Sequence, residues 1–304
     1  MTRSAKVTTP TNNNIIHLLL LLLLSHLLLS TNSLPLTFSD GNNHTITQNY
    51  TNTNVFLLNG TTLLLAQHAT IISAPPSSSD AEEAIRVENS IFIGQGGIIV
   101  GGEGVGGTGV TVTTNKESDQ VSSATFEGGI EVYGGSAGRE STTRGGNAVQ
   151  ILQVGSEVTF YGGKFVPGTG CTRDVCGVPT DDGNSIQLLY GKAIIKGGTF
   201  EGNIYSVSGV VEVHGCVEFD GERISGFLLD GSRMDVVYVG DVNDLDIVYD
   251  ASVCQEELTD VEEPSDSSAT PSNANARFNA FARITRMSFS LRSLLLISAL
   301  GMIP

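Results

Sequence analysis

The sequence predicts an all-β protein, a right-handed parallel β-helix in which each coil of the solenoid takes about 19–20 residues. Two repeated phrases predict this fold. The first is an apolar residue, a spacer and two glycines, which ends a short strand and turns a corner, because glycine enters left-handed backbone regions without steric cost. It occurs, the last copy being degenerate, at 126–129, 132–135, 160–163, 195–198 and 213–216.

The second phrase, Gly-Asn followed by an apolar run, sets the period. It begins at Gly146, Gly183 and Gly202, and the last two copies start 19 residues apart. The first two start 37 residues apart, which we interpret as one coil plus a loop insertion over 166–182. The runs between the glycines are rich in Val, Ile, Phe and Tyr, which is typical of short strands. The β-helix is predicted over 34–250, and a β-sandwich is the main competing fold.

In a β-helix the inward side chains stack from coil to coil. The core is therefore predicted to contain large apolar side chains that follow one another at the repeat period: Phe126, Phe160, Phe165, Ile195, Phe200 and Phe219. The alternative is that some of these aromatic rings form a platform for a ligand. The chain has no tryptophan, which removes one residue that commonly stacks on sugars.

The start of the chain predicts export. Residues 1–33 combine a basic beginning, a leucine-rich run and small polar residues, the layout of a secretory signal peptide; a retained signal anchor is the alternative. Three sequons for N-linked glycosylation follow, at Asn43, Asn49 and Asn59. The sequence thus predicts a secreted or cell-surface glycoprotein.

The four cysteines are an even number in a chain predicted to be exported, so disulfides are expected. Cys171 and Cys176 share one loop and are expected to pair. Cys216 would then pair with Cys254 and tie the last coils together. A zinc site is disfavoured because the spacing of the loop cysteines is not C-x-x-C and no histidine is near.

The C-terminal end changes character. Residues 251–276 are predicted to be an acidic and polar linker, and 277–304 a basic, apolar tail. Three interpretations of the tail stay open: the signal for a glycolipid (GPI) anchor, an amphipathic helix on the membrane surface, or an unstructured tail. The first two imply membrane association.

The charge of the chain restricts its partners. The formal net charge is −16, which disfavours nucleic acid because phosphate binding needs a surplus of Lys and Arg. Asp241, Asp244 and Asp246 cluster near the end of the solenoid. They are either a solvated, turn-forming face or a calcium site, although their spacing matches neither an EF-hand loop nor a nonapeptide calcium repeat. No other cofactor is expected.

Two short motifs resemble catalytic or cofactor-binding signatures. Residues 134–138 fit G-x-S-x-G, and 102–107 contain G-x-G-x-x-G. A nucleophile elbow and a dinucleotide site both require a helix directly after the motif, whereas a polar loop and a strand-like run follow here. We interpret both as glycine-rich turns.

Residues 40–250 resemble the pectin-lyase-like superfamily of right-handed β-helices in rung length, apolar stacking and Gly-Gly corners, for example at 194–200. The resemblance implies a fold and not an activity, since the superfamily includes polysaccharide lyases, glycosidases and non-catalytic surface or adhesive proteins. The Gly-His-Gly and Arg-Ile-Lys phrases of polygalacturonases are missing.

Few residues fit a catalytic role, and the predicted function follows from this. Asp181 and Asp182 form an adjacent acidic pair, with Arg173 in the same loop; a capped turn is the structural alternative. We therefore expect a non-catalytic protein of the cell surface or extracellular matrix, structural, adhesive or glycan-recognising, with an extracellular glycan or protein as partner. The alternative is a polysaccharide lyase or glycoside hydrolase that uses these three residues.

Overall fold

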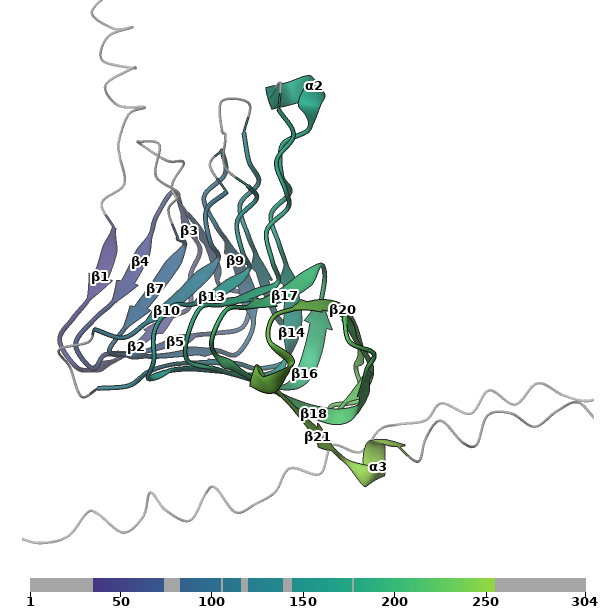
Figure 1. Cartoon of the computed structure of the whole chain (residues 1–304). Coiled ribbons are helices and arrows are strands. Elements are labelled where there is room, and N and C mark those ends of the chain that lie inside the picture. The colour runs from purple at the N-terminus through teal and green to yellow at the C-terminus, as the bar shows by residue number, and fades with distance from the viewer. Residues whose placement is uncertain are drawn as a thin grey trace, which may run out of the picture. The chain divides into compact units, whose positions relative to one another are not determined.

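The computed structural model describes residues 35–73, 83–104, 106–115, 120–138, 144–176 and 178–254. In this part the protein is all-β, with 21 strands in one mixed sheet that winds into a nearly closed solenoid (Figure 1). The predicted leader over 1–33 and tail over 277–304 lie outside the described residues. Within them, no helix has the length and apolar character needed to cross a membrane.

The strands form three stacks, and neighbours within a stack are parallel and one coil apart (Figure 1). The first stack is β1 (Leu36–Phe38), β4 (Val55–Leu57), β7 (Ile85–Glu88), β10 (Val110–Thr113), β13 (Val149–Ile151), β15 (Ile186–Leu188), β17 (Asn203–Ser206) and β20 (Arg233–Val239). The second is β2 (Asn43–Ile46), β5 (Thr62–Leu65), β8 (Ile91–Gly94), β11 (Ser122–Phe126), β14 (Ser156–Val166), β16 (Lys192–Phe200), β18 (Val210–Phe219) and β21 (Leu245–Tyr249). The third is β3 (Tyr50–Thr51), β6 (Thr70–Ile72), β9 (Gly97–Val100), β12 (Ile130–Tyr133) and the ends of β14 and β16.

The register gives the length of each coil. Val149 pairs with Ile186, so the step of 37 residues between the first two Gly-Asn phrases is one coil plus the insertion. Ile186 pairs with Ile204, so the third phrase is offset by one residue from the alignment predicted from Gly202. Coils without an insertion are short: Leu36 lies opposite Val55, which is one coil further along the chain. Insertions lengthen the other coils.

The Gly-Gly phrases stack as predicted in the second stack, where Phe160 lies opposite Ile195 and Ile195 opposite Val213. The second glycine of three copies has a positive φ, at Gly129, Gly163 and Gly198, which explains why glycine is required at this corner. The phrase that begins at Val132 is different. Val132 pairs with Phe165 in the third stack, and its glycines leave the solenoid at another corner.

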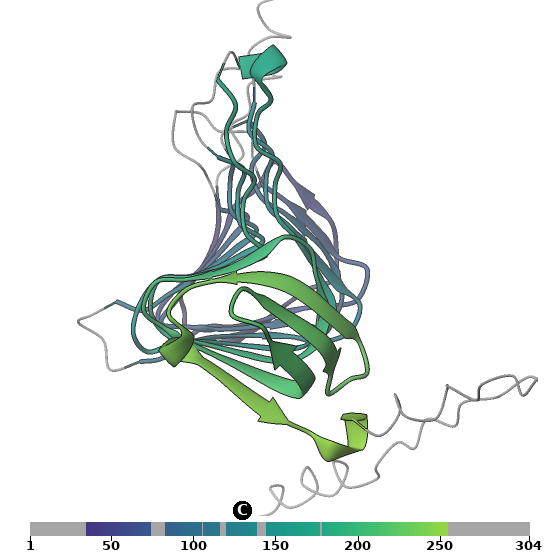
Figure 2. The ribbon, with the colours of Figure 1, turned by 45° about the vertical axis from the view of Figure 1, so that its right-hand side comes forward.

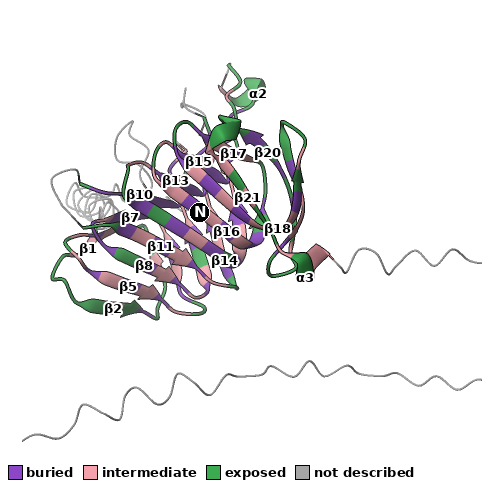
Figure 3. Cartoon of the chain, turned by 60° about the horizontal axis from the view of Figure 1, so that its bottom comes forward, coloured by how far each residue is buried: buried purple, intermediate pink, exposed green. Residues whose placement is uncertain are grey.

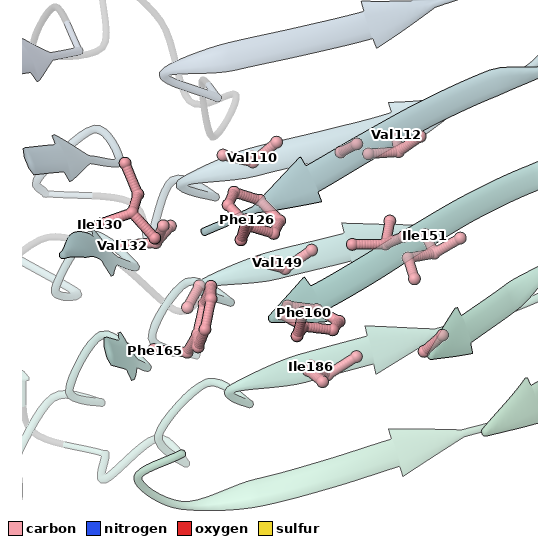
Figure 4. Close-up of a cluster of buried hydrophobic side chains, with 14 of the residues drawn as sticks. Val110, Val112, Phe126, Ile130, Val132, Val149, Ile151, Phe160, Phe165 and Ile186 are labelled. Atoms are coloured by element: carbon pink, nitrogen blue, oxygen red, sulfur yellow. The ribbon is translucent and has the colours of Figure 1, made fainter. Parts of the chain in front are cut away.

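The core lies inside the three stacks (Figure 4). Phe126, Phe160, Phe165 and Ile195 are fully buried, and Phe200 is 7% exposed, as predicted. The rings contact one another across coils: Phe126 and Phe160 are stacked with centroids 5.4 Å apart. Phe219 differs, because it is only partly buried at the C-terminal end, where it packs edge-on against Tyr238.

The C-terminal end departs from the simple repeat. Residues 223–228 do not form another coil, because β19 (Arg223–Leu228) pairs antiparallel with both β18 and β20. The 3-10 helix η1 (Val242–Asp244) then leads into β21, and helix α3 (Ala251–Cys254) follows it. Helix α3 occupies the first residues of the predicted linker. Both predicted cysteine pairs are confirmed as disulfide pairs, Cys171 with Cys176 and Cys216 with Cys254.

Three insertions leave the same corner, between the third and first stacks, and project together from the solenoid (Figure 2). We call the described residues of 101–109, 134–147 and 167–184 the glycine arm. Neighbouring chain segments of the arm are joined by backbone hydrogen bonds that recur every third residue. The amide of Gly101 donates to the carbonyl of Tyr133 and that of Gly104 to Ser136, at 2.9 and 2.8 Å. A three-residue repeat is typical of polyproline-II-like chains, whereas a strand repeats every two.

A second set of hydrogen bonds crosses the arm and is made by glycines alone. The amide of Gly183 donates to Gly168, that of Gly168 to Gly146, and that of Gly146 to Gly135, at 2.8 to 2.9 Å. A Cβ on Gly168 would lie 2.0 Å from the carbonyl oxygen of Gly135, so only glycine fits. The arm carries helix α2 (Arg173–Cys176) and its disulfide at the far end (Figure 1).

Candidate functional site

A groove of about 400 Å³ lies along the corner between the first and second stacks. Its lining comes from the turns of successive coils. The residues are Val121, Val154, Gly155, Ser156, Glu157, Gly191, Lys192, Ser208, Gly209, Val210 and Asp244. Because each coil contributes one short segment, the groove runs from coil to coil beside the strands shown in Figure 3.

Glycines precede three of the second-stack strands that border the groove. Gly155 comes before β14, Gly191 before β16 and Gly209 before β18. Gly191 has a φ of +94°, and a Cβ there would lie 2.5 Å from the carbonyl oxygen of Ser156. A side chain would therefore strain the turn and overlap the backbone of the preceding coil.

A smaller hollow of about 280 Å³ adjoins the groove and shares Val154 with it. Leu152, Gln153 and Tyr190 complete its lining. Val154 is 79% exposed and Tyr190 46% exposed. Together the two hollows, which we call the corner groove, combine exposed apolar surface with an amide and with charged groups, a combination typical of ligand sites.

Lys192 links the corner groove to charged side chains on the neighbouring strands. Glu157 lies opposite Lys192 in the register of β14 and β16. The Lys192 Nζ lies 2.5 Å from Glu212 Oε2, and Glu212 also contacts the His214 ring. Asp246 of β21 lies opposite Glu212. Three carboxylates, a lysine and a histidine therefore form one outward row that extends from the groove.

These contacts favour the charged forms of both Lys192 and Glu212. The hydrogen bond to Glu212 raises the pKa of Lys192 above its ordinary value, and the negative charges of Glu157 and Asp246 add to this effect. The hydrogen bonds from Lys192 and His214 lower the pKa of Glu212. Lys192 is therefore a poor general base, and Glu212 a poor general acid, at neutral pH. The arrangement suits binding better than proton transfer.

The residues predicted as catalytic lie elsewhere, in the glycine arm. The Asp182 carboxylate accepts the amide of Gly170 at 2.6 Å, and the Asp182 carbonyl accepts a hydrogen bond from Arg144 at 3.2 Å. Arg173 begins α2 at the arm's end, and among the described residues no hydrogen bond or ion pair joins it to Asp181 or Asp182. Asp182 therefore closes the base of its loop, as the capped-turn alternative expected.

The aspartates considered for calcium occupy three different settings. Asp241 caps η1, its carboxylate accepting the amide of Asn243 at 3.0 Å. Asp244 lines the groove, and Asp246 lies on β21. In the described part of the chain, no three His, Cys, Asp or Glu residues come together as a metal site.

The three predicted glycosylation sites lie on the first two coils. Asn43 begins β2, Asn49 lies between β2 and β3, and Asn59 lies in the turn before β5, and all three are exposed. Asn59 has a φ of +58°, a conformation that asparagine tolerates better than most residues.

Comparisons with protein-family models, curated proteins and solved structures found no match. The corner groove was not predicted from the sequence. The sequence feature that borders it is the glycine before β14, β16 and β18.

Proposed function

We propose that this protein is an exported or surface-held glycoprotein that binds a linear glycan along the corner groove without cleaving it. The observation that carries the proposal is the direction of the groove, which crosses successive coils from Val121 to Asp244. Neighbouring strands are about 4.8 Å apart, so a groove across five coils is roughly 19 Å long. An extended polymer matches this shape better than a compact small molecule does.

The lining favours a neutral sugar chain. Tyr190, Val121 and Val154 offer exposed apolar surface on which the C–H face of a sugar ring can pack, and the Gln153 amide beside them can donate or accept. Glu157 and Asp244 outnumber Lys192 in the groove, and the whole chain has a net charge of −16. An acidic glycan would therefore be repelled, as would nucleic acid.

A second candidate function is a polysaccharide lyase or glycoside hydrolase. It is favoured by the presence of two carboxylates and a lysine, Glu157, Asp244 and Lys192, along one groove. Against it, Lys192 already holds an ion pair with Glu212. A glycosidase also needs one carboxyl group with a raised pKa, whereas the shifted carboxyl groups of the described residues, Asp40, Glu212, Asp220 and Asp250, are all shifted down.

The handedness and the coil length of the solenoid are part of the same proposal. We infer that the solenoid is right-handed, with coils of about 19–20 residues where no insertion intervenes, and thus similar to the pectin-lyase-like superfamily. The support is the parallel pairing of consecutive coils in all three stacks, because crossovers between parallel strands are right-handed in about 98% of cases.

The location is inferred from the sequence. A leader over 1–33 and three sequons support secretion or display in the extracellular matrix. The tail over 277–304 is proposed to associate with the membrane, either through a glycolipid anchor or as a surface helix.

The test is a screen of the secreted protein against neutral and acidic polysaccharides, with and without calcium, scored for both binding and release of new chain ends. The proposal expects binding to a neutral polymer with no release. Release that is abolished by Glu157→Gln and retained in Asp182→Asn would place an enzyme in the groove. Release abolished only by Asp182→Asn would place it in the arm.

A further inference from the structure

The first coil of the solenoid has an open edge. Among the described residues, β1, β2 and β3 each pair with a strand on one side only. The amide of Leu36 and the carbonyl of Phe38 bond to coil two, at 2.8 and 2.9 Å. The backbone groups of Thr37, which lies between them, therefore point away from the solenoid. By the same alternation, those of Asn43 and Thr45 in β2 also face the open edge, since Asn42 and Ile46 bond to coil two.

The side chains at this end are apolar and incompletely covered. Leu36, Phe38 and Tyr50 are only partly buried, although they pack against the core. The edge strands and turns over 36–51 contain a single charged residue apart from histidine, Asp40. An edge with a single acidic side chain, whose outward backbone groups pair with no described strand, is a template for pairing with another chain.

The opposite end is protected in a different way. Strand β19 is paired on both sides, with β18 and β20. Strand β21 pairs only with β18 among the described residues, but it is flanked or occupied by Asp241, Asp244, Asp246 and Asp250. Charge on an edge strand discourages pairing with a second copy.

The sequons are distributed unevenly. All three Asn-x-Thr triplets of the chain lie on the first two coils, and the third coil onward has none. Asn43 stands on the open edge strand β2, and Asn49 follows it in the same coil. The bulky modification is thus placed at the end that lacks charge.

We propose that an N-linked glycan at Asn43, on the edge strand itself, caps the open edge of the first coil and keeps the protein monomeric. Asn49, whose Oδ1 accepts the amide of Thr70 in coil two, adds a second glycan beside it. The proposal rests on the export part of the proposed function. Without the glycans, two copies pair through β1 and β2 about a two-fold axis. Within the described residues, one end of the solenoid has a single acidic side chain and the other has several, so this association closes as a dimer and does not continue as a fibre.

The experiment uses the full chain from a host that glycosylates secreted proteins. Thr45→Ala with Thr51→Ala removes both sequons and leaves Asn43 and Asn49 in place. Thr45→Ser with Thr51→Ser is the matched control, because Asn-x-Ser is still an acceptor. Mass spectrometry reports the glycans, and light scattering during size exclusion reports the molar mass. We expect the alanine variant to double its molar mass and the serine variant to remain monomeric.

A third variant tests the edge itself. Thr37→Pro, added to the alanine variant, removes an amide that faces the open edge and no hydrogen bond to coil two. It should restore the monomer. Trimming the glycans of the folded wild-type protein with an endoglycosidase should produce the dimer without any substitution.

Three results would overturn the proposal: a monomeric alanine variant, a dimer that Thr37→Pro does not disrupt, or wild-type protein that is exported without glycans at Asn43 and Asn49. Glycan binding in the corner groove is measured on the same samples. It should be equal in monomer and dimer, so failure of the groove proposal is distinguishable from failure of this one.

Discussion

The carbonyl oxygen of Gly146 occupies the space that a side chain on Gly183 would need, because a Cβ there would lie only 1.9 Å from it. The amide of Gly183 donates to the carbonyl of Gly168, in a neighbouring turn of the same arm. The glycine arm is therefore held together by backbone contacts that exclude every side chain, and each of its central glycines is structurally required.

Gly183→Ala is accordingly expected to destabilise the arm. Relieving an overlap with rigid backbone costs about 1–3 kcal/mol, seen as a lower unfolding temperature and faster proteolysis of the arm. The matched control is Gly128→Ala, where a Cβ would meet nothing within 4 Å and the change should be close to neutral. Equal effects of the two variants would show that the arm does not pack in this way.

Phe200 is predicted to be a principal core residue of the last full coil. Its ring stacks on Phe165 with centroids 5.0 Å apart, so Phe200→Ala should lower the free energy of unfolding by about 3–5 kcal/mol. Val154→Ala, at a position 79% exposed, should change it by less than about 0.5 kcal/mol. Urea denaturation of both variants measures this, and a small loss for Phe200→Ala would contradict the core.

The two disulfides are predicted to contribute unequally. Cys216 and Cys254 are 38 residues apart, whereas Cys171 and Cys176 are 5 apart. In the chain-entropy model a longer loop gives more stabilisation, typically about 2–4 kcal/mol. Cys254→Ser should therefore lower the unfolding temperature more than Cys176→Ser does. The reverse order would show that the last coils do not depend on the Cys216 bridge.

Acid is predicted to weaken the ion pairs beside the corner groove. The pKa of Glu212 is below its ordinary value of 4.5, first because Lys192 and then because His214 donates to it. A lowered pKa in the folded state stabilises the fold above pH 4.5, and this contribution is lost as the pH falls through the folded-state pKa.

Glu212→Gln should therefore reduce stability at pH 7 by less than about 1 kcal/mol. The difference from wild type should vanish as the pH falls from 5 toward 2. Glu218→Gln, at an exposed site on the same strand, is the control for the substitution itself. Urea midpoints across this pH range provide the measurement. A Glu212→Gln effect that persists at pH 2 would contradict the assignment.

Stacking across coils and the cysteine pairs were predictable from the sequence. Phe160, Ile195 and Val213 occupy neighbouring coils because a strand that ends in Gly-Gly returns to the same corner. The phrase at Val132 could not be distinguished from the other copies, because it has the same pattern of residue types. Its two glycines nevertheless begin the glycine arm and do not turn the corner after the second stack. The antiparallel pairing of β19 was missed because apolar alternation is the same in parallel and antiparallel strands.

The corner groove could not be predicted for a different reason. It depends on a register between coils that the linear pattern does not specify, which brings Val121, Lys192 and Asp244 to one corner. Asp182, in contrast, was conspicuous in the sequence, but its carboxylate is used to hold the amide of Gly170.

The most direct test of the groove is the affinity of the protein for neutral oligosaccharides of increasing length, measured by calorimetry. Affinity should rise with length until the chain spans the coils from Val121 to Asp244, and then level off. Tyr190→Ala should weaken binding by about tenfold, whereas Tyr161→Ala, at an equally exposed ring outside the groove, should not. Affinity independent of length, or equal in both tyrosine variants, would contradict the account.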